Sequence, residues 1–158
     1  MSARISLLIL SILLVSTSLY AQAQQDPWMA TWKLNLAKSK YDPGPPPRSQ
    51  TVKREAWGAN GVKYTSDSVN AQGESGHSEY TANYDGKDYP VIGDPNRDTV
   101  SLKRIDAHSY EFTSKKGGQV TTAGRTVVSP DGKTLTITSK GTNAQGQPVD
   151  NVTVFDKQ

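Results

Sequence analysis

The residues able to carry nucleophilic or metal chemistry are few. The chain has two histidines, His77 and His108, and no cysteine, and both histidines lie in or beside predicted turns. No Gly-x-Ser-x-Gly segment marks a nucleophilic serine. A covalent mechanism needs a nucleophile beside a base, and a zinc site needs three or four nitrogen or sulfur ligands. The sequence therefore predicts no catalytic residues, no metal site and no cofactor, and the chain is not expected to be an enzyme.

Paired carboxylates are the other candidates for acid–base work. Asp85 with Asp88, and Asp94 with Asp98, are the closest pairs outside the termini. Both pairs lie in turn sequences, where aspartate is already explained by its hydrogen bonds to the turn backbone. The segment from Asp94 to Asp98 also lacks the glycine of a calcium-binding loop, so we expect structural roles for all four.

Arginine on an apolar face is more informative. Arg104 shares a strand face with Val100 and Leu102. If that face is interior, the guanidinium is buried and needs a partner, such as a ligand carboxylate or phosphate bound in two-pronged fashion. Alternatively, the strand ends at Leu102, and Arg104 reaches solvent or pairs with an internal carboxylate. Arg125 poses the same alternatives on a later strand.

Aromatic residues recur at a spacing of two in two segments. Tyr80 and Tyr84 share one strand face, and Tyr110 and Phe112 share another. Such stripes pack a core, or they line a pocket with their hydroxyl groups aimed at a ligand.

These residues must be positioned by short strands. From residue 50 onward, turn signals recur about every 8–14 residues, which is typical of an all-β domain. The predicted strands are 30–36, 50–57, 62–69, 77–84, 88–92, 99–105, 110–115, 120–129, 135–139 and 149–155. Asp85-Gly86-Lys87 is a predicted tight hairpin turn, and Pro90 predicts an edge strand. Sequential hairpins without helical periodicity indicate an all-β fold, an antiparallel up-and-down β-barrel of about 8–10 strands.

Composition agrees with a single small domain. The chain has 158 residues, 34% of them hydrophobic, and a net charge of +3. The basic residues form no dense stripe, so nucleic acid is not an expected partner. Between Pro43 and Pro47 lie four prolines in five positions, which predict an extended surface connection. That connection is a rigid loop, a docking segment or a lid over a barrel mouth.

The first 23 residues have the three parts of a secretory signal. Arg4 supplies the positive charge, 5–19 is apolar, and Ala21-Gln22-Ala23 is a small-x-small cleavage site. An uncleaved anchor is the alternative, but the apolar run is shorter than the ~20 residues of a membrane span. We expect a signal peptide over 1–23, cleavage after Ala23, and a periplasmic or secreted domain over 24–158 without stable membrane insertion.

The two ends of the predicted domain resemble one protein family. Ala30-Thr31-Trp32-Lys33-Leu34 resembles the Gly-x-Trp signature that opens lipocalins and related calycins, and 152–157 is similar to the last strand of the fatty-acid-binding branch. The chain also resembles small secreted bacterial lipocalin-like proteins. It departs from the pattern at Ala30, where the family has glycine, and at Thr153, where the family has an arginine that stacks on the tryptophan.

The resemblance implies a barrel that binds a small apolar or amphipathic molecule in its cavity. Trp32 would form the barrel floor, and the ligand site would lie at the other end. The ligand-binding candidates are Tyr80, Tyr84, Arg104, Tyr110, Phe112 and Arg125. The alternative is a solid-cored barrel that acts through its surface, as an envelope interaction module or as an inhibitor of an exported enzyme, with a protein partner that the sequence does not identify.

The cleavage site is directly testable. N-terminal sequencing of the protein recovered from the extracytoplasmic fraction should begin at Gln24. Material that begins at Met1 would show that the leader is retained.

Overall fold

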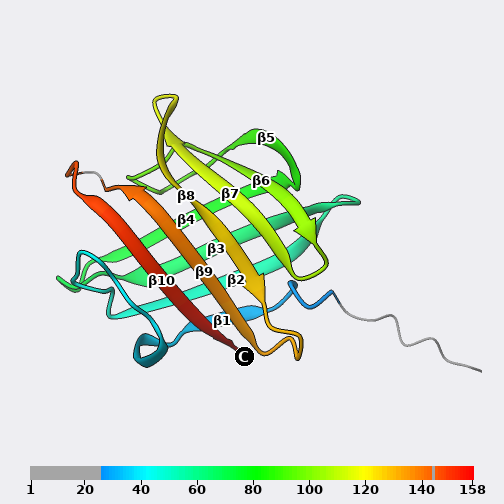
Figure 1. Cartoon of the computed structure of the whole chain (residues 1–158), viewed down its shortest axis with the longest axis horizontal. Coiled ribbons are helices and arrows are strands. Elements are labelled where there is room, and N and C mark those ends of the chain that lie inside the picture. The colour runs from blue at the N-terminus through cyan, green and yellow to red at the C-terminus, as the bar shows by residue number, and fades with distance from the viewer. Residues whose placement is uncertain (1–25, 144) are drawn as a thin grey trace, which may run out of the picture.

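The computed structural model describes residues 26–143 and 145–158 (Figure 1). The predicted signal peptide and its cleavage site lie outside this described part. Within it, no helix has the length and apolar character needed to cross a membrane.

Ten strands make up most of the described chain, as the alternating polar and apolar residues predict. They are joined by short turns, apart from two longer connections: residues 35–48, which contain a single 3₁₀ turn, η1 (Leu36–Lys38), and residues 91–98. The strands are β1 (Thr31–Leu34), β2 (Ser49–Trp57), β3 (Gly61–Val69), β4 (Ser75–Asn83), β5 (Asp85–Pro90), β6 (Thr99–Asp106), β7 (Ser109–Lys116), β8 (Gln119–Val128), β9 (Thr134–Thr142) and β10 (Pro148–Lys157).

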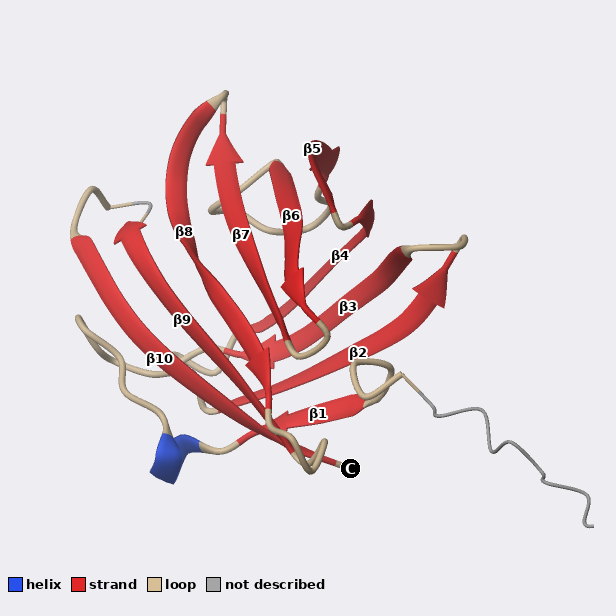
Figure 2. Ribbon diagram, turned by 45° about the vertical axis from the view of Figure 1, so that its right-hand side comes forward, coloured by secondary structure: helices blue, strands red, loops and turns tan. Residues whose placement is uncertain are grey.

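The strands form one antiparallel sheet in the order β4-β3-β2-β1-β10-β9-β8-β7-β6-β5. The first and last strands pair with each other, so the sheet curls into a nearly closed barrel (Figures 1 and 2). The two edge strands, β4 and β5, meet at a seam. Among the described residues, a single β-bridge spans this seam, from Glu79 on β4 to Ile92 just beyond β5, and their backbones exchange two hydrogen bonds of 2.9 Å. The prediction of an all-β up-and-down barrel is confirmed.

The predicted hairpin at Asp85-Gly86-Lys87 is wrong. The chain turns at Tyr84, and these three residues begin β5, which pairs with β6 instead of β4. The Asp85 carboxylate accepts hydrogen bonds from the Lys87 backbone N–H at 3.1 Å and the Tyr89 hydroxyl at 3.0 Å. This local turn is absorbed as an irregularity in the β5 register between Asp85 and Asp88. The strand that contains Pro90 does lie at the edge of the sheet, as predicted.

One face of each strand packs into the barrel. On β2, Val52 and Arg54 are buried, whereas Thr51, Lys53 and Glu55 are exposed. Trp32 is completely buried, and its indole Nε1 donates to the Trp28 carbonyl at 3.3 Å. Among the described residues no arginine lies over this indole, and the nearby cation is Lys157, whose Nζ is 6.0 Å from the ring centroid.

The barrel has two distinct ends. At the N-terminal end, residues 26–30 cross the opening, and Trp28 Nε1 donates to the Ala107 carbonyl in the β6–β7 turn at 2.9 Å. The opposite end carries the β3–β4 turn, the β5–β6 loop and the long β1–β2 connection. In that connection, Lys40 and Asp42 bond to the backbone of β10, and the proline segment follows as a loop without regular structure.

Two tryptophans provide a matched test of this packing. Trp32→Ala should lower the free energy of unfolding by about 3–5 kcal/mol, because it empties a fully buried site. Trp57 is 39% exposed, so Trp57→Ala should cost less than about 1 kcal/mol. Urea unfolding followed by circular dichroism measures both. Equal losses would contradict the burial of Trp32.

Candidate functional site

An arginine occupies the centre of the barrel. Arg54, on β2, is only 2% exposed. Its guanidinium carbon lies 5.4 Å, 5.8 Å and 5.1 Å from the ring centroids of Trp28, Tyr64 and Tyr110. Its Nη2 donates a hydrogen bond to the Tyr110 hydroxyl, and its Nε has no partner. No ion pair within the described residues involves Arg54, so aromatic rings take the place of a counter-ion.

Two effects act in opposite directions on the charge of Arg54 inside this cage of Trp28, Tyr64 and Tyr110. Burial acts against the charged form of Arg54, whereas the oxygens of Tyr110, Tyr84 and Tyr80 favour it, and the pKa of the guanidinium is raised above its ordinary value. Arginine therefore remains a cation here. A guanidinium over an aromatic ring gains roughly 0.5–2 kcal/mol, most when water is excluded. Three rings can thus offset much of the cost of burying the charge.

Tyrosines fill the space around Arg54. Tyr64 and Tyr80 stack with ring centroids 4.6 Å apart and an interplanar angle of 10°. Tyr84 and Tyr110 are tilted by 58° at 5.2 Å. Burial raises the pKa of the Tyr80 and Tyr84 hydroxyls, which therefore stay neutral at ordinary pH. The centre of the barrel is thus a packed aromatic layer and not an open channel.

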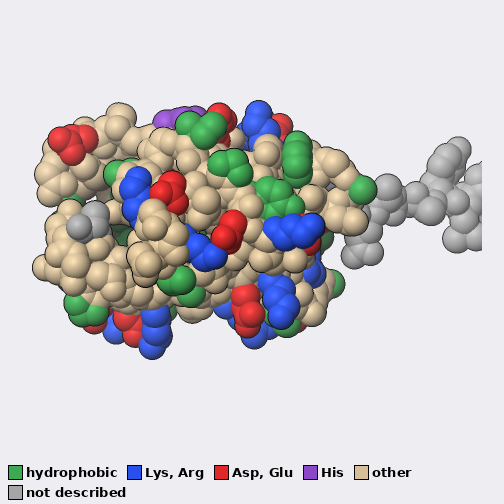
Figure 3. Space-filling model, turned by 90° about the horizontal axis from the view of Figure 1, so that it is seen from above, with side chains coloured by type: hydrophobic (Ala, Val, Ile, Leu, Met, Phe, Trp, Pro, Cys, Tyr) green, Lys and Arg blue, Asp and Glu red, His purple; other side chains and the backbone are tan. Residues whose placement is uncertain are grey.

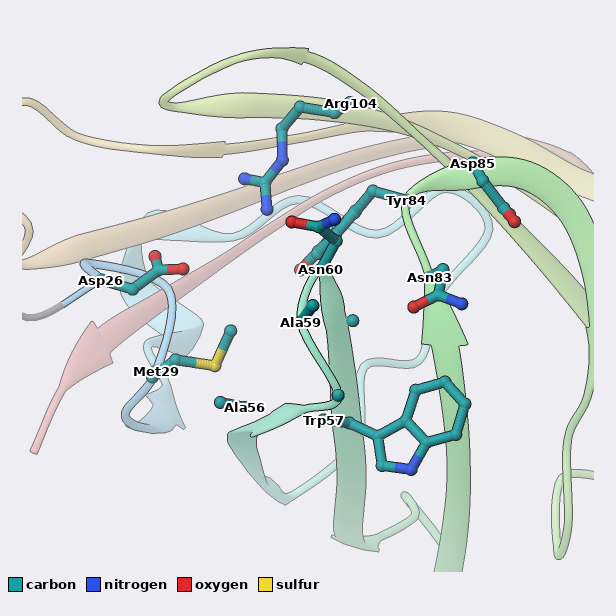
Figure 4. A pocket seen from close by; sticks show the side chains of 12 residues that line it. Asp26, Met29, Ala56, Trp57, Ala59, Asn60, Asn83, Tyr84, Asp85 and Arg104 are labelled. Carbon is teal, nitrogen blue, oxygen red and sulfur yellow. The ribbon is translucent and has the colours of Figure 1, made fainter.

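A hollow of about 810 Å³ lies at the N-terminal end, which we call the N-terminal hollow (Figure 4). Its walls come from the N-terminal segment, the β2–β3 turn, the β4–β5 junction and β6. Its lining residues are Asp26, Met29, Ala56, Trp57, Gly58, Ala59, Asn60, Gly61, Asn83, Tyr84, Asp85 and Arg104.

Arg104 is the cation of this hollow. It reaches from β6 toward the N-terminal segment (Figure 4). Its guanidinium carbon lies 3.9 Å from the Tyr84 ring centroid and 5.4 Å from that of Trp28. Within the described residues, the guanidinium makes no hydrogen bond and no ion pair. The rings hold this group by its faces, which leaves its N–H edges available to an acceptor.

Neither carboxylate of the hollow forms an ion pair with Arg104. Asp85 points away from Arg104 (Figure 4) and accepts the bonds from Lys87 and Tyr89 described above. Asp26 accepts from the Trp28 backbone N–H at 3.0 Å. The Tyr84 hydroxyl is buried without a hydrogen-bond partner. The hollow therefore combines apolar surface from Met29 with a few unsatisfied polar groups.

The sequence-predicted residues fall into three groups. Arg104 and Tyr84 lie together in the N-terminal hollow. Tyr80 and Tyr110 belong to the central aromatic layer, and Phe112 is half-buried against the core. Arg104 lies near Trp28, whose carbonyl accepts a hydrogen bond from the Trp32 indole. The expectation that the site lies at the end opposite Trp32 is therefore wrong for this residue.

Arg125 does not face the interior. It lies on the outer face of β8, where Nη2 donates to Ser109 Oγ at 2.7 Å and is 3.6 Å from Asp106. The interior alternative for Arg125 is therefore wrong, because β8 turns Thr126 and Val128 inward.

Two central residues, Arg54 and Tyr64, were missed by the sequence analysis. The signal for Arg54 was present, because Val52, Arg54 and Ala56 alternate with polar Lys53 and Glu55 just as Val100, Leu102 and Arg104 alternate on β6.

Charged residues on the surface shown in Figure 3 are mixed in sign. Within the described part of the chain, no three His, Asp or Glu side chains are grouped to hold a metal ion.

Comparisons with known proteins find a similar fold but no similar sequence. The sequence matches no protein-family model and no curated protein sequence. The structure is similar to the crystal structure of zebrafish ileal bile acid-binding protein in complex with cholic acid, with a TM-score of 0.48 and 14% sequence identity. The match covers 84% of this chain and 99% of the zebrafish protein. At this level of identity the likeness concerns the fold and says nothing of the ligand.

Substitution of Arg54 tests the central cage. Arg54→Ala should lower the free energy of unfolding by about 2–5 kcal/mol, because it leaves a cavity and an unpartnered Tyr110 hydroxyl. Arg54→Met keeps most of the volume and removes the buried charge, so its loss should be smaller by at least about 1 kcal/mol.

Arg125→Ala on the outer face is the control, expected within about 0.5 kcal/mol of the unsubstituted protein. Urea unfolding measures all three variants. If Arg54→Met were as damaging as Arg54→Ala, the charge itself would be the stabilising feature.

Proposed function

We propose that this chain is a lipocalin-like binding protein that holds a small amphipathic molecule in the N-terminal hollow. The observation that carries the proposal is the Arg104 guanidinium, which lies against the Tyr84 ring and near the Trp28 ring and whose donors have no partner among the described residues. A side chain held in this way is preorganised, so little conformational freedom is lost when a ligand binds.

The size and lining of the hollow support this function. A volume of about 810 Å³ falls within the roughly 300–1,000 Å³ of small-molecule sites. Met29, Trp57 and the Tyr84 ring offer apolar contact, and Arg104 and Asn60 offer polar contact. A ligand with an apolar body and one hydrogen-bond-accepting group, such as a carboxylate, matches both.

The packed centre limits how deep the ligand lies. Because Tyr80, Tyr110 and Arg54 fill the middle of the barrel, the ligand would sit at one end against Tyr84 and would not thread the axis. The proposal is one of binding without catalysis. The predicted signal peptide over 1–23 supports export, so the ligand would be met in the periplasm or outside the cell.

A second candidate is a barrel that acts through its surface, as an interaction module or an inhibitor of an exported enzyme. The packed aromatic centre favours it, since a barrel filled in this way needs no ligand. The two candidates differ in whether the N-terminal hollow binds a small molecule.

Titration with 1-anilinonaphthalene-8-sulfonate, an anionic aromatic amphiphile, separates them. Its fluorescence should rise on binding to the native protein, and Arg104→Met should weaken the affinity about tenfold or more through loss of charge-assisted hydrogen bonds. Arg125→Met removes an arginine from the outer face and should leave the affinity unchanged. Absence of binding, or equal effects of the two variants, would favour the surface-acting candidate.

A further inference from the structure

A second hollow of about 540 Å³ lies at the opposite end of the barrel, which we call the polar hollow. Its walls are the inward side chains of β2, β3 and β4 together with the β5–β6 loop. Gln50, Tyr64, Ser66 and Ser78 contribute from the strands, and Asp94 and Arg97 contribute from the loop. It shares no lining residue with the N-terminal hollow.

Arg97 is the most informative residue of the polar hollow. Its Nε donates to Asp94 Oδ2 at 2.8 Å, and the two side chains are only 17% and 20% exposed. The guanidinium carbon lies 5.9 Å and 5.6 Å from the ring centroids of Tyr64 and Tyr80. Neither terminal nitrogen of Arg97 bonds to a described residue. A largely desolvated guanidinium therefore has free donors in the hollow that it lines.

The loop that carries Arg97 is fixed to the barrel wall. Glu79 and Ile92 exchange two backbone hydrogen bonds. Gly93 follows with φ +82°, and a Cβ there would collide with the His77 carbonyl oxygen. The Asn96 N–H donates to Asp94 Oδ1 at 2.9 Å, which holds the carboxylate in place. Arg97 and Asp94 are therefore preorganised before any ligand binds.

The polarity of the lining selects the class of ligand. Asp94 offsets the charge of Arg97, and Glu74 adds a negative charge at the rim, so an anion is disfavoured. The other polar side chains are hydroxyls and amides, apart from His77, whose Nδ1 lies 2.6 Å from Asp67 Oδ1. Gln50 Nε2 donates to Ser66 Oγ at 2.8 Å, which leaves the Ser66 hydroxyl proton free. Such a mixture of donors and acceptors beside a tyrosine pair suits a neutral molecule with many hydroxyl groups.

We propose that the polar hollow is a second binding site, for a neutral polyhydroxylated molecule such as a short saccharide. The terminal nitrogens of Arg97 donate to ligand hydroxyl oxygens, and Ser66, Ser78 and Asp94 complete the polar contacts. This site is independent of the proposed function of the N-terminal hollow, because the residues and the ligand chemistry both differ.

Amide chemical-shift titration of ¹⁵N-labelled protein tests the proposal. Maltotriose and N,N′-diacetylchitobiose are the neutral probes, and octanoate is the probe for the N-terminal hollow. At least one saccharide should shift the amides of Ser66, Ser78 and Arg97 in a saturable way and leave those of Tyr84 and Arg104 unmoved. Shifts from neither saccharide, or shifts confined to another surface, would overturn the proposal.

Two variants assign the effect to side chains. Arg97→Met keeps the contact with the tyrosines and should weaken saccharide binding about tenfold. Arg104→Met should leave it unchanged, while it weakens octanoate binding. Ser78→Ala makes a small change that the fold tolerates and should weaken saccharide binding by a few-fold. Unchanged saccharide affinity in both Arg97→Met and Ser78→Ala would overturn the assignment, whatever the result with octanoate.

Discussion

The Arg54 guanidinium lies at the centre of the barrel, where no carboxylate of the described residues pairs with it. Aromatic rings must therefore supply the favourable electrostatics that an ion pair would give elsewhere. Trp28, Tyr64 and Tyr110 surround the guanidinium, and these residues come from the N-terminal segment, β3 and β7. One buried charge thus ties together three parts of the chain that are distant in sequence.

This layer divides the molecule into two ends with different chemistry. Tyr84 and Trp28 extend the layer toward the N-terminal hollow, where they hold Arg104. Tyr64 and Tyr80 extend it the other way, where they hold Arg97. The Arg104 guanidinium contacts protein only through its faces, and Arg97 uses Nε for Asp94, so both arginines keep terminal N–H groups without a partner among the described residues. The same stacking that stabilises the barrel therefore prepares both hollows for hydrogen-bond acceptors.

Most of the fold follows from the sequence, because a period of two and frequent turn residues specify strands directly. Which face of a strand points inward is harder. On β2, Val52 and Ala56 alternate with lysine and glutamate, so the inward position of Arg54 could have been predicted. On β8, both faces carry valine and threonine, and the sequence does not decide between Arg125 and Thr126. Contacts such as that of Trp28 with Arg104 depend on the curl of the whole sheet and cannot be read from local pattern.

The seam between β4 and β5 determines where the barrel wall opens locally at the lowest cost in free energy. Each neighbouring pair in the strand order is joined by a ladder of backbone hydrogen bonds, but across the seam the described residues exchange only the two bonds between Glu79 on β4 and Ile92 beyond the end of β5. Local opening costs least where fewest such bonds must break. We therefore expect the first local opening of the barrel at this seam, which is followed directly in sequence by Gly93 and Asp94 of the polar hollow. Such an opening breaks none of the hydrogen bonds that join β1 to β10.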